Sequence, residues 1–256
     1  MRRGANSYEE SRTFFRLVAY AARRFGVRCT VVVPLGNNPS KNRAIRLFGA
    51  ELIEHGRDFD EAKEHAATIA RERGCAFVPS FDRDLVIGVA TYAHEFFTAV
   101  ADLDTVYVPI GLGSGICGVI GMRDALGLAT RVVGVVAQNA NAYALSFLSG
   151  HVVPTNAART FADGMAVRVP DAAALDVIRR GAERIVEVTE DEIAEAIRLY
   201  FSATHTLTEG AAAAPLAALM KERERMKGRR VGLVVSGQNI DRPVMAKVLA
   251  GVTPGA

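Results

Sequence analysis

The chain has 256 residues, of which 50% are hydrophobic and 23% are charged, and its formal net charge at pH 7 is +3. These values are typical of a globular enzyme and argue against a nucleic-acid-binding protein, because the arginines are interspersed with acidic residues. No apolar run approaches the ~18 residues that a membrane span needs, and the N-terminus shows no apolar secretory signal. The three cysteines match no metal or redox motif and are typical of a reducing compartment. We therefore expect a cytoplasmic protein without a metal site and without a membrane or nucleic-acid partner.

The apolar residues alternate between helix-like and strand-like patterns along most of the chain. Residues 1–12 are polar and show neither pattern. We expect helices over residues 13–25, 40–48, 58–73, 85–100, 115–126, 141–148, 172–182, 189–200 and 209–227. We expect strands over residues 28–33, 51–54, 76–78, 105–110, 131–137, 185–188 and 230–235. Thr189 and Glu192 have the spacing of a capping box at the start of one of these helices.

Strands that alternate with helices over short connections pair in parallel through right-handed crossovers. We therefore predict an α/β fold with two open parallel-sheet domains. The smaller domain would span residues 10–80 and the larger residues 81–256. In such a fold a ligand is expected in the cleft at the carboxyl ends of the strands.

The most informative stretch is the junction between the strand expected at 105–110 and the helix that follows it. The apolar run Val106–Ile110 meets four glycines in eight residues, at positions 111, 113, 115 and 118. Glycines let the backbone approach an anion closely, and the free N–H groups and dipole of a helix start attract negative charge. The junction therefore predicts a phosphate-binding loop.

Two other interpretations of this loop remain open. Gly113, Gly115 and Gly118 satisfy the G-x-G-x-x-G fingerprint of dinucleotide-binding enzymes. That fingerprint also requires an acid after the next strand, where this chain has Gln138 and Asn139. A purely structural turn would need only one or two glycines. A dinucleotide-binding loop, which would indicate an NAD-binding oxidoreductase, and a purely structural turn therefore both remain as alternatives.

Eight segments of the chain resemble, in the expected order, fold-type II pyridoxal-phosphate enzymes of the threonine dehydratase and serine racemase group. The segments are Val18–Arg23, Cys29–Asn38, Lys41–Gly56, Val108–Gly118, Phe161–Gly164, Val188–Ile193, Glu209–Ala211 and Ser236–Asn239. The resemblance implies two open parallel-sheet α/β domains of the kind found in the β-subunit of tryptophan synthase. It also implies pyridoxal 5'-phosphate as the cofactor.

The resemblance assigns roles to several residues. The cofactor phosphate would be held, mainly through backbone N–H groups, by Gly111, Leu112, Gly113, Ser114 and Gly115. Leu112 and Ser114 replace two of the family's usual glycines, which requires ordinary φ and ψ at both positions. Ser236 resembles the residue that hydrogen-bonds the pyridine nitrogen. Glu209 would lie near the ring or the substrate, unless it is only a solvated carboxylate at a helix start.

The lysine that this family needs to form a Schiff base with the cofactor is absent from its expected place. It belongs to a Phe-Lys-x-Arg-Gly-Ala motif, and Arg3-Gly4-Ala5 resembles the tail of that motif, with Met1 in the lysine position. The strand and the Ser-x-Gly-Asn-His substrate loop expected next are also absent. None of the five lysines lies in a matching context: Lys41, Lys63, Lys221, Lys227 and Lys247. We therefore expect a truncated or disrupted copy with an incomplete small domain.

The resemblance implies an ammonia-lyase that converts a β-hydroxy amino acid to a 2-oxo acid and ammonia. Without the family lysine we assign no catalytic residue and expect little activity from this chain. Which hydroxyamino acid is the substrate stays open, because the segment that binds its carboxylate is the absent one. An alternative is a catalytically silent module that binds pyridoxal phosphate or an amino acid. By analogy with the family we expect a homodimer.

Overall fold

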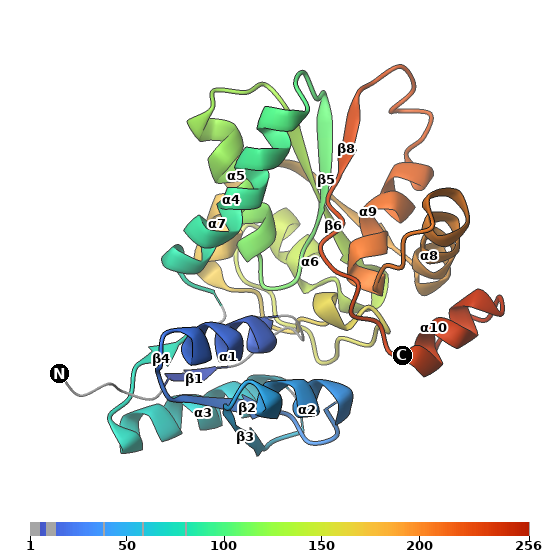
Figure 1. The fold of residues 1–256 in the computed structure, drawn as a ribbon. Coiled ribbons are helices and arrows are strands. Elements are labelled where there is room, and N and C mark those ends of the chain that lie inside the picture. Colours follow the sequence, from blue (N-terminus) through green and yellow to red (C-terminus); the bar gives the residue numbers. More distant parts are fainter. Residues whose placement is uncertain (1–5, 9–13, 38, 58, 80, 256) are drawn as a thin grey trace. The chain divides into compact units, whose positions relative to one another are not determined.

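The computed structural model describes residues 6–8, 14–37, 39–57, 59–79 and 81–255 (Figure 1). Within these ranges it describes side chains except at 6–8, 14–17, 39–41 and 59–60. The chain divides into two compact units, residues 1–82 and residues 83–256, and each is described by itself.

The smaller unit contains a four-stranded sheet flanked by three helices. Its elements are β1 (Asn6–Tyr8), α1 (Phe14–Arg24), β2 (Cys29–Val33), α2 (Pro39–Leu47), β3 (Glu51–Glu54), α3 (Phe59–Arg73) and β4 (Phe77–Val78). The strand order is β3-β2-β1-β4, and every neighbouring pair is parallel. The chain thus moves outward from β1 to β3 and then returns through α3 to place β4 on the other side of β1.

Strand β1 corrects the prediction that residues 1–12 contain no element and that the strand before the first helix is absent. Asn6–Tyr8 pairs with β2 on one side and with β4 on the other. Three polar residues carry no alternating apolar pattern, so the strand arises from backbone hydrogen bonding to both neighbours. Met1, Gly4 and Ala5, on which the missing-lysine prediction rests, lie outside the described residues.

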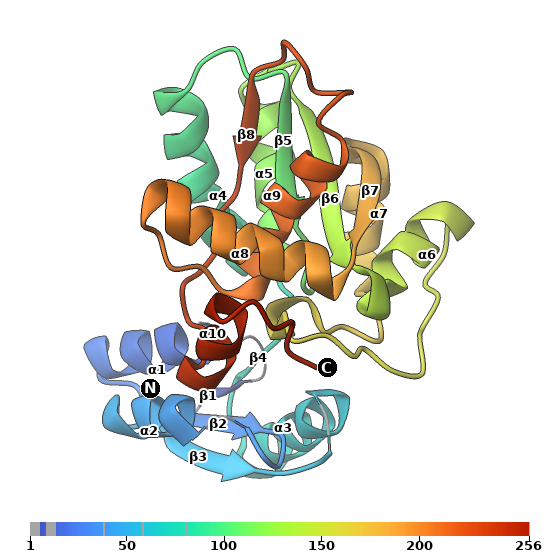
Figure 2. The same cartoon turned by 90° about the vertical axis from the view of Figure 1, so that its right-hand side faces the viewer.

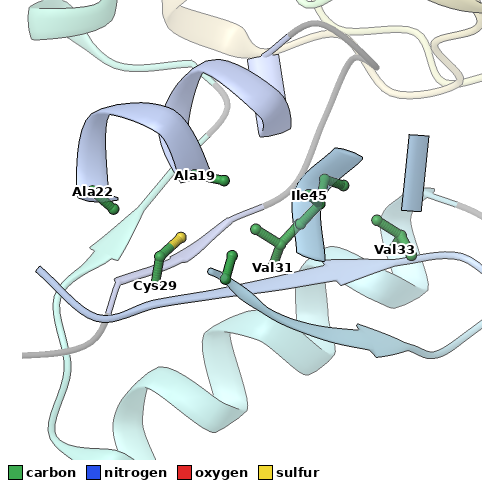
Figure 3. Packing of buried hydrophobic residues seen from close by; sticks show 7 residues of the cluster. Ala19, Ala22, Cys29, Val31, Val33 and Ile45 are labelled. Atoms are coloured by element: carbon green, nitrogen blue, oxygen red, sulfur yellow. The ribbon is translucent and has the colours of Figure 1, made fainter. Parts of the chain in front are cut away.

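The core of the smaller unit shows why β2 is almost entirely apolar. Cys29, Val31 and Val33 pack on one face of the sheet against α1 and α2, with Ala19 and Ile45 (Figure 3). The intervening Val32 packs on the opposite face against three small or branched residues of α3, which are Ala62, Ala66 and Ile69. Because successive strand residues point to opposite faces, a central parallel strand must be apolar at nearly every position.

The imidazole rings of His55, just after β3, and His65, on α3, stack with 3.7 Å between ring centroids. Burial and the neighbouring His55 lower the pKa of His65, while Glu72 acts in the opposite direction. Because the folded state disfavours the protonated ring, His65 costs no stability above its unfolded pKa of about 6.5. Stability is lost as the pH falls from there toward the folded pKa.

We therefore expect His65 to titrate below pH ~6.5 in an NMR pH titration of its ring protons. His55→Ala should raise the titration midpoint and Glu72→Gln should lower it, because the two neighbours act with opposite signs. A midpoint that does not move in His55→Ala would show that the stack does not influence this histidine.

The larger unit has a second sheet with the same pattern of connections. Its elements are α4 (Arg83–Ala99), β5 (Thr105–Pro109), α5 (Ser114–Ala125), β6 (Arg131–Ala137), η1 (Gln138–Ala140), α6 (Ala142–Ser149), η2 (Asp163–Met165), α7 (Ala172–Gly181), β7 (Ala182–Val188), α8 (Glu190–Thr204), α9 (Gly210–Lys221), β8 (Val231–Leu233) and α10 (Arg242–Leu249). The strand order is β7-β6-β5-β8, again with parallel pairs only. The predicted α/β class with two parallel sheets is confirmed.

Helices cover both faces of this sheet. α4, α5 and α7 lie on one face, and α8 and α9 lie on the other (Figures 1 and 2). α9 packs closely against β5, β6 and β7 because its first two turns are mostly buried alanines. No helix in the part of the chain that the structure describes combines the length and apolar character needed to cross a membrane.

Most predicted elements of the larger unit lie within a few residues of the observed ones. The capping box at Thr189 and Glu192 is present, with both reciprocal hydrogen bonds. One prediction at its C-terminal end is wrong, because α9 ends at Lys221 rather than at residue 227, and α10 was not predicted. α10 packs on α8.

A cluster of polar side chains lies between β5, β7 and the end of α9. Arg184 donates two hydrogen bonds to the carboxylate of Glu222, at 2.9 and 2.5 Å. The hydroxyl of Tyr107 donates to the same carboxylate at 2.5 Å. Burial alone would raise the pKa of Glu222, but these hydrogen bonds outweigh it and hold the pKa below its ordinary value. The cluster therefore joins three elements that lie far apart in the sequence.

Candidate phosphate-binding site

The carboxyl ends of β5 and β8 mark the place where the strand order of the larger unit reverses. From β5 the chain proceeds to β6 and β7, and it then returns to put β8 on the other side of β5. The glycine loop follows β5, and the segment Ser236–Asn239 follows β8. In open parallel sheets this switch point is where ligands bind, because the two loops diverge and leave room between them.

The glycine loop presents a row of backbone donors. The last sheet bond before it runs from the Ile110 N–H to the Val135 carbonyl, and the first helical bond runs from the Cys117 N–H to the Gly113 carbonyl. The six intervening N–H groups, of residues 111–116, donate to no acceptor among the described residues. No side chain caps the helix start. The positive end of α5 is therefore available to an anion.

Gly113 has a conformation that other residues adopt only at a cost. Its φ is 104° and its ψ is −6°, and it is the N-cap of α5. A Cβ built there would lie 2.8 Å from the Ala174 Cβ. Leu112 and Ser114, by contrast, have no positive φ. These two residues stand where the family usually has glycines, and their φ is one that residues with a side chain adopt without strain. Leu112 points its side chain into the core, with 7% of its surface exposed.

A second turn approaches the loop from η2. A Cβ built on Gly111 would lie 2.5 Å from the Gly164 carbonyl oxygen, so the two backbones are in contact there. Glu190 holds the start of this turn, because its Oε2 accepts hydrogen bonds from the Phe161 N–H and the Thr160 hydroxyl, each at 3.0 Å. Burial raises the pKa of Glu190. The hydrogen bonds of Glu190 therefore connect the segment at 188–193 to the segment at 161–164.

Glu209 lies against the segment that follows β8. Its N–H donates to the Gly237 carbonyl and its Oε2 accepts from the Asn239 N–H, both at 3.2 Å. A Cβ on Gly237 would lie 2.6 Å from the Glu209 Oε1, so only glycine allows this approach. The carboxylate is therefore held in place and is more than a solvated helix-start residue. Ser236 is exposed at the same edge of the sheet.

The structure thus brings the predicted loop residues together, and it brings Glu209 beside the Ser236–Asn239 segment. It adds Gly164, Glu190 and Tyr143 as residues that shape the loop's surroundings. Gly164 and Glu190 lie in segments that the family resemblance already contained. Tyr143 carries no signal in the sequence, because its partner Leu112 is 31 residues away.

Other reactive groups do not complete the site. Cys117 lies in the first turn of α5, but burial, reinforced by the charge of Asp171, raises the pKa of its thiol to about 12. The Lys221 ammonium donates to the Glu187 carbonyl and pairs with Glu192. Among the described side chains, no lysine forms a hydrogen bond or ion pair with the loop. The same residues contain no cluster of three or more His, Cys, Asp or Glu that could hold a metal.

Residues 16–237 match the protein family described as pyridoxal-phosphate dependent enzyme. The chain belongs to this family. It is 36% identical over 233 residues to the L-threonine ammonia-lyase of Geobacter sulfurreducens, which covers 91% of this chain and 58% of the relative. It is 33% identical, with the same coverage, to the L-threonine ammonia-lyase of Thermotoga maritima.

Solved structures of the family agree with this assignment. The processed form of threonine deaminase isoform 2 from Solanum lycopersicum superposes with a TM-score of 0.88 at 27% identity, over 97% of this chain and 74% of that chain. The predicted resemblance to the threonine dehydratase group is therefore confirmed, and pyridoxal phosphate is confirmed as the cofactor of the family. The chain spans 58% of the length of the two curated relatives above.

Proposed function

We propose that the larger unit binds the phosphate of pyridoxal phosphate at residues 111–115. We further propose that the whole protein is an ammonia-lyase that acts on a β-hydroxy amino acid such as threonine or serine. The observation that carries the proposal is the row of six backbone N–H groups without acceptors at the switch point of the sheet. The ammonia-lyase names of the relatives support the reaction type.

The residues around the loop fit a phosphate in charge and in space. The amides would donate to its oxygens, and Gly111 and Gly113 let the loop backbone lie against the Gly164 carbonyl and against Ala174. Ser236 would offer its hydroxyl to the pyridine nitrogen, and Glu209, held by the Asn239 N–H, would lie near the ring or the substrate. When bound, the cofactor supplies an electron sink for the α-carbon of the amino acid.

This chain has no lysine that we can assign to the Schiff base needed for turnover. No described lysine is bonded to the loop, and Met1 takes the family position in the resemblance. We therefore propose that this chain binds the cofactor but releases little or no 2-oxo acid. A homodimer and a cytoplasmic location complete the proposal, the latter because the three cysteines are free.

The test combines binding with turnover. Purified protein is mixed with pyridoxal phosphate, the change in cofactor absorbance is followed, and borohydride reduction is followed by intact and peptide mass measurement. We expect saturable binding, no stoichiometric adduct on any one lysine, and no 2-oxo acid from threonine or serine. Ser114→Pro, which removes one loop N–H and also disfavours the ψ of −6° at Gly113, should weaken the binding.

Each of the other possible results of this test contradicts a different part of the proposed function. A specific lysine adduct with release of 2-oxo acid would show that a substitute lysine works and would refute the impaired activity. Binding of NAD in place of pyridoxal phosphate would favour the oxidoreductase alternative. Absence of any cofactor binding would refute the phosphate site itself.

A further inference from the structure

The hydroxyl of Tyr143 connects the glycine loop to two helices behind it. Tyr143 lies on α6 and is buried, with 2% of its surface exposed. Its hydroxyl donates to the Leu112 carbonyl at 2.6 Å. The same hydroxyl accepts from the Asp171 N–H, at the N-cap of α7, at 3.1 Å. Because a backbone N–H can only donate, the tyrosine proton is directed to the Leu112 carbonyl.

This bond determines which way one peptide group of the loop faces. The Leu112 carbonyl and the Gly113 N–H belong to the same peptide unit, and the chain has no cis peptide bond among the described residues. In a trans peptide the carbonyl and the N–H point in opposite directions. A Leu112 carbonyl that accepts from Tyr143 therefore keeps the Gly113 N–H turned away from Tyr143.

The alternative orientation would harm anion binding. Gly113 has no Cβ, so it tolerates the change of φ that a flip of the 112–113 peptide requires. A flipped peptide would present the Leu112 carbonyl oxygen to the phosphate and withdraw one donor. The hydrogen bond from Tyr143 to the Leu112 carbonyl opposes that flip. Helix α7 holds Tyr143 in place, because the Asp171 N–H donates to its hydroxyl and the Asp171 carboxylate caps this helix at the Ala173 and Ala174 N–H groups.

We infer that Tyr143 is a positioning residue for the phosphate loop, which holds the Leu112–Gly113 peptide in its donor orientation through the Leu112 carbonyl. The inference rests on the proposed binding of the cofactor phosphate at residues 111–115. Tyr143 itself does not contact the phosphate in this scheme. It acts only through the peptide group that it fixes.

The test uses Tyr143→Phe, which keeps the ring and removes the hydroxyl. The matched control is Tyr200→Phe on α8, which also removes a buried tyrosine hydroxyl, one with no hydrogen-bond partner among the described residues. We expect Tyr143→Phe to raise the dissociation constant for pyridoxal phosphate about five- to tenfold, the effect of losing one well-placed donor. Tyr200→Phe should leave it within about twofold of the parent chain.

A residue-resolved measurement separates positioning from general loosening. In the parent chain, added inorganic phosphate should shift the NMR amide signals of Gly113, Gly115 and Ile116. In Tyr143→Phe the shift of Gly113 should fall most, because only its peptide has lost the restraint. Equal losses at all three amides would mean general damage to the loop and would overturn the inference.

The remaining outcomes distinguish the inference from the proposed function. If the parent chain binds pyridoxal phosphate and Tyr143→Phe binds it equally well, with an unchanged Gly113 shift, the positioning role is refuted and the phosphate site stands. If the parent chain binds neither pyridoxal phosphate nor inorganic phosphate, the proposed site is refuted and the inference is refuted with it.

Discussion

Gly113→Ala should lower the affinity for pyridoxal phosphate by more than about tenfold and destabilise the larger unit by about 2–4 kcal/mol. The residue has a φ of 104°, where an alanine costs about 1–2 kcal/mol. The new Cβ would also lie 2.8 Å from the Ala174 Cβ and 3.2 Å from the Tyr143 hydroxyl, so the loop must move. Urea unfolding and cofactor titration measure the two effects.

Gly121→Ala in the same helix is the matched control. Gly121 has an ordinary φ, and a Cβ there would meet nothing within 4 Å. An alanine in a helix interior is favoured over glycine by roughly 0.5–1 kcal/mol, so this variant should be as stable as the parent or slightly more stable. If Gly113→Ala behaves like Gly121→Ala in both measurements, the left-handed turn is not what shapes the phosphate site.

Glu222→Ala should destabilise the larger unit by about 2–4 kcal/mol. The substitution removes the carboxylate that binds Arg184 and Tyr107 and leaves the guanidinium largely buried without its main partner. Both side chains of the ion pair are only 17% exposed, so solvent replaces little of the lost interaction. Urea unfolding at pH 7 measures the loss.

The same pair predicts a pH dependence with a definite sign. The pKa of Glu222 is held below its ordinary value in the folded state. The contribution of the ionised Glu222 to the free energy of unfolding is therefore fully present above the unfolded pKa of about 4.3. It is lost as the pH falls through the folded pKa. Below that range the parent chain and Glu222→Ala should therefore converge in stability.

Glu224→Ala is the control for this pair. Glu224 is 83% exposed and faces Arg223 at 3.7 Å, so its removal should change stability by less than about 0.5 kcal/mol at any pH. If Glu222→Ala is as mild as Glu224→Ala, the cluster between β5, β7 and α9 contributes nothing to stability.

Local pattern predicted most elements of the larger unit because each of these carries its own signal. The apolar run of β6, the capping box of α8 and the strand–glycine–helix junction at residues 105–126 are all properties of neighbouring residues. The glycine loop could be found for the same reason, since its donors come from consecutive backbone groups. That Ser236 and Glu209 belong to the same site rests on the family resemblance and stays a prediction.

Two elements were missed for different reasons. β1 is three polar residues whose strand conformation depends on β2 and β4. No periodicity in a short segment can report a partner that lies elsewhere in the chain. α10 has local helix signals that were overlooked, because Asp241 is its N-cap, a proline lies in its first turn and Gly251 follows its end. The boundary of α9 was also misplaced, and Glu222, its C-cap residue, is hydrogen-bonded by Tyr107, 115 residues away.

The sequence by itself determined the α/β class, the family and the position of the glycine loop, because these depend on local order and composition. Only the tertiary structure decided how the loop is supported. The return of the chain that puts β8 beside β5, the turn held by Glu190, and the Tyr143 hydroxyl behind Leu112 all join residues far apart in the chain. Such contacts form when the sheet assembles, since hydrogen bonds and packing depend on distance in space and not on distance along the chain.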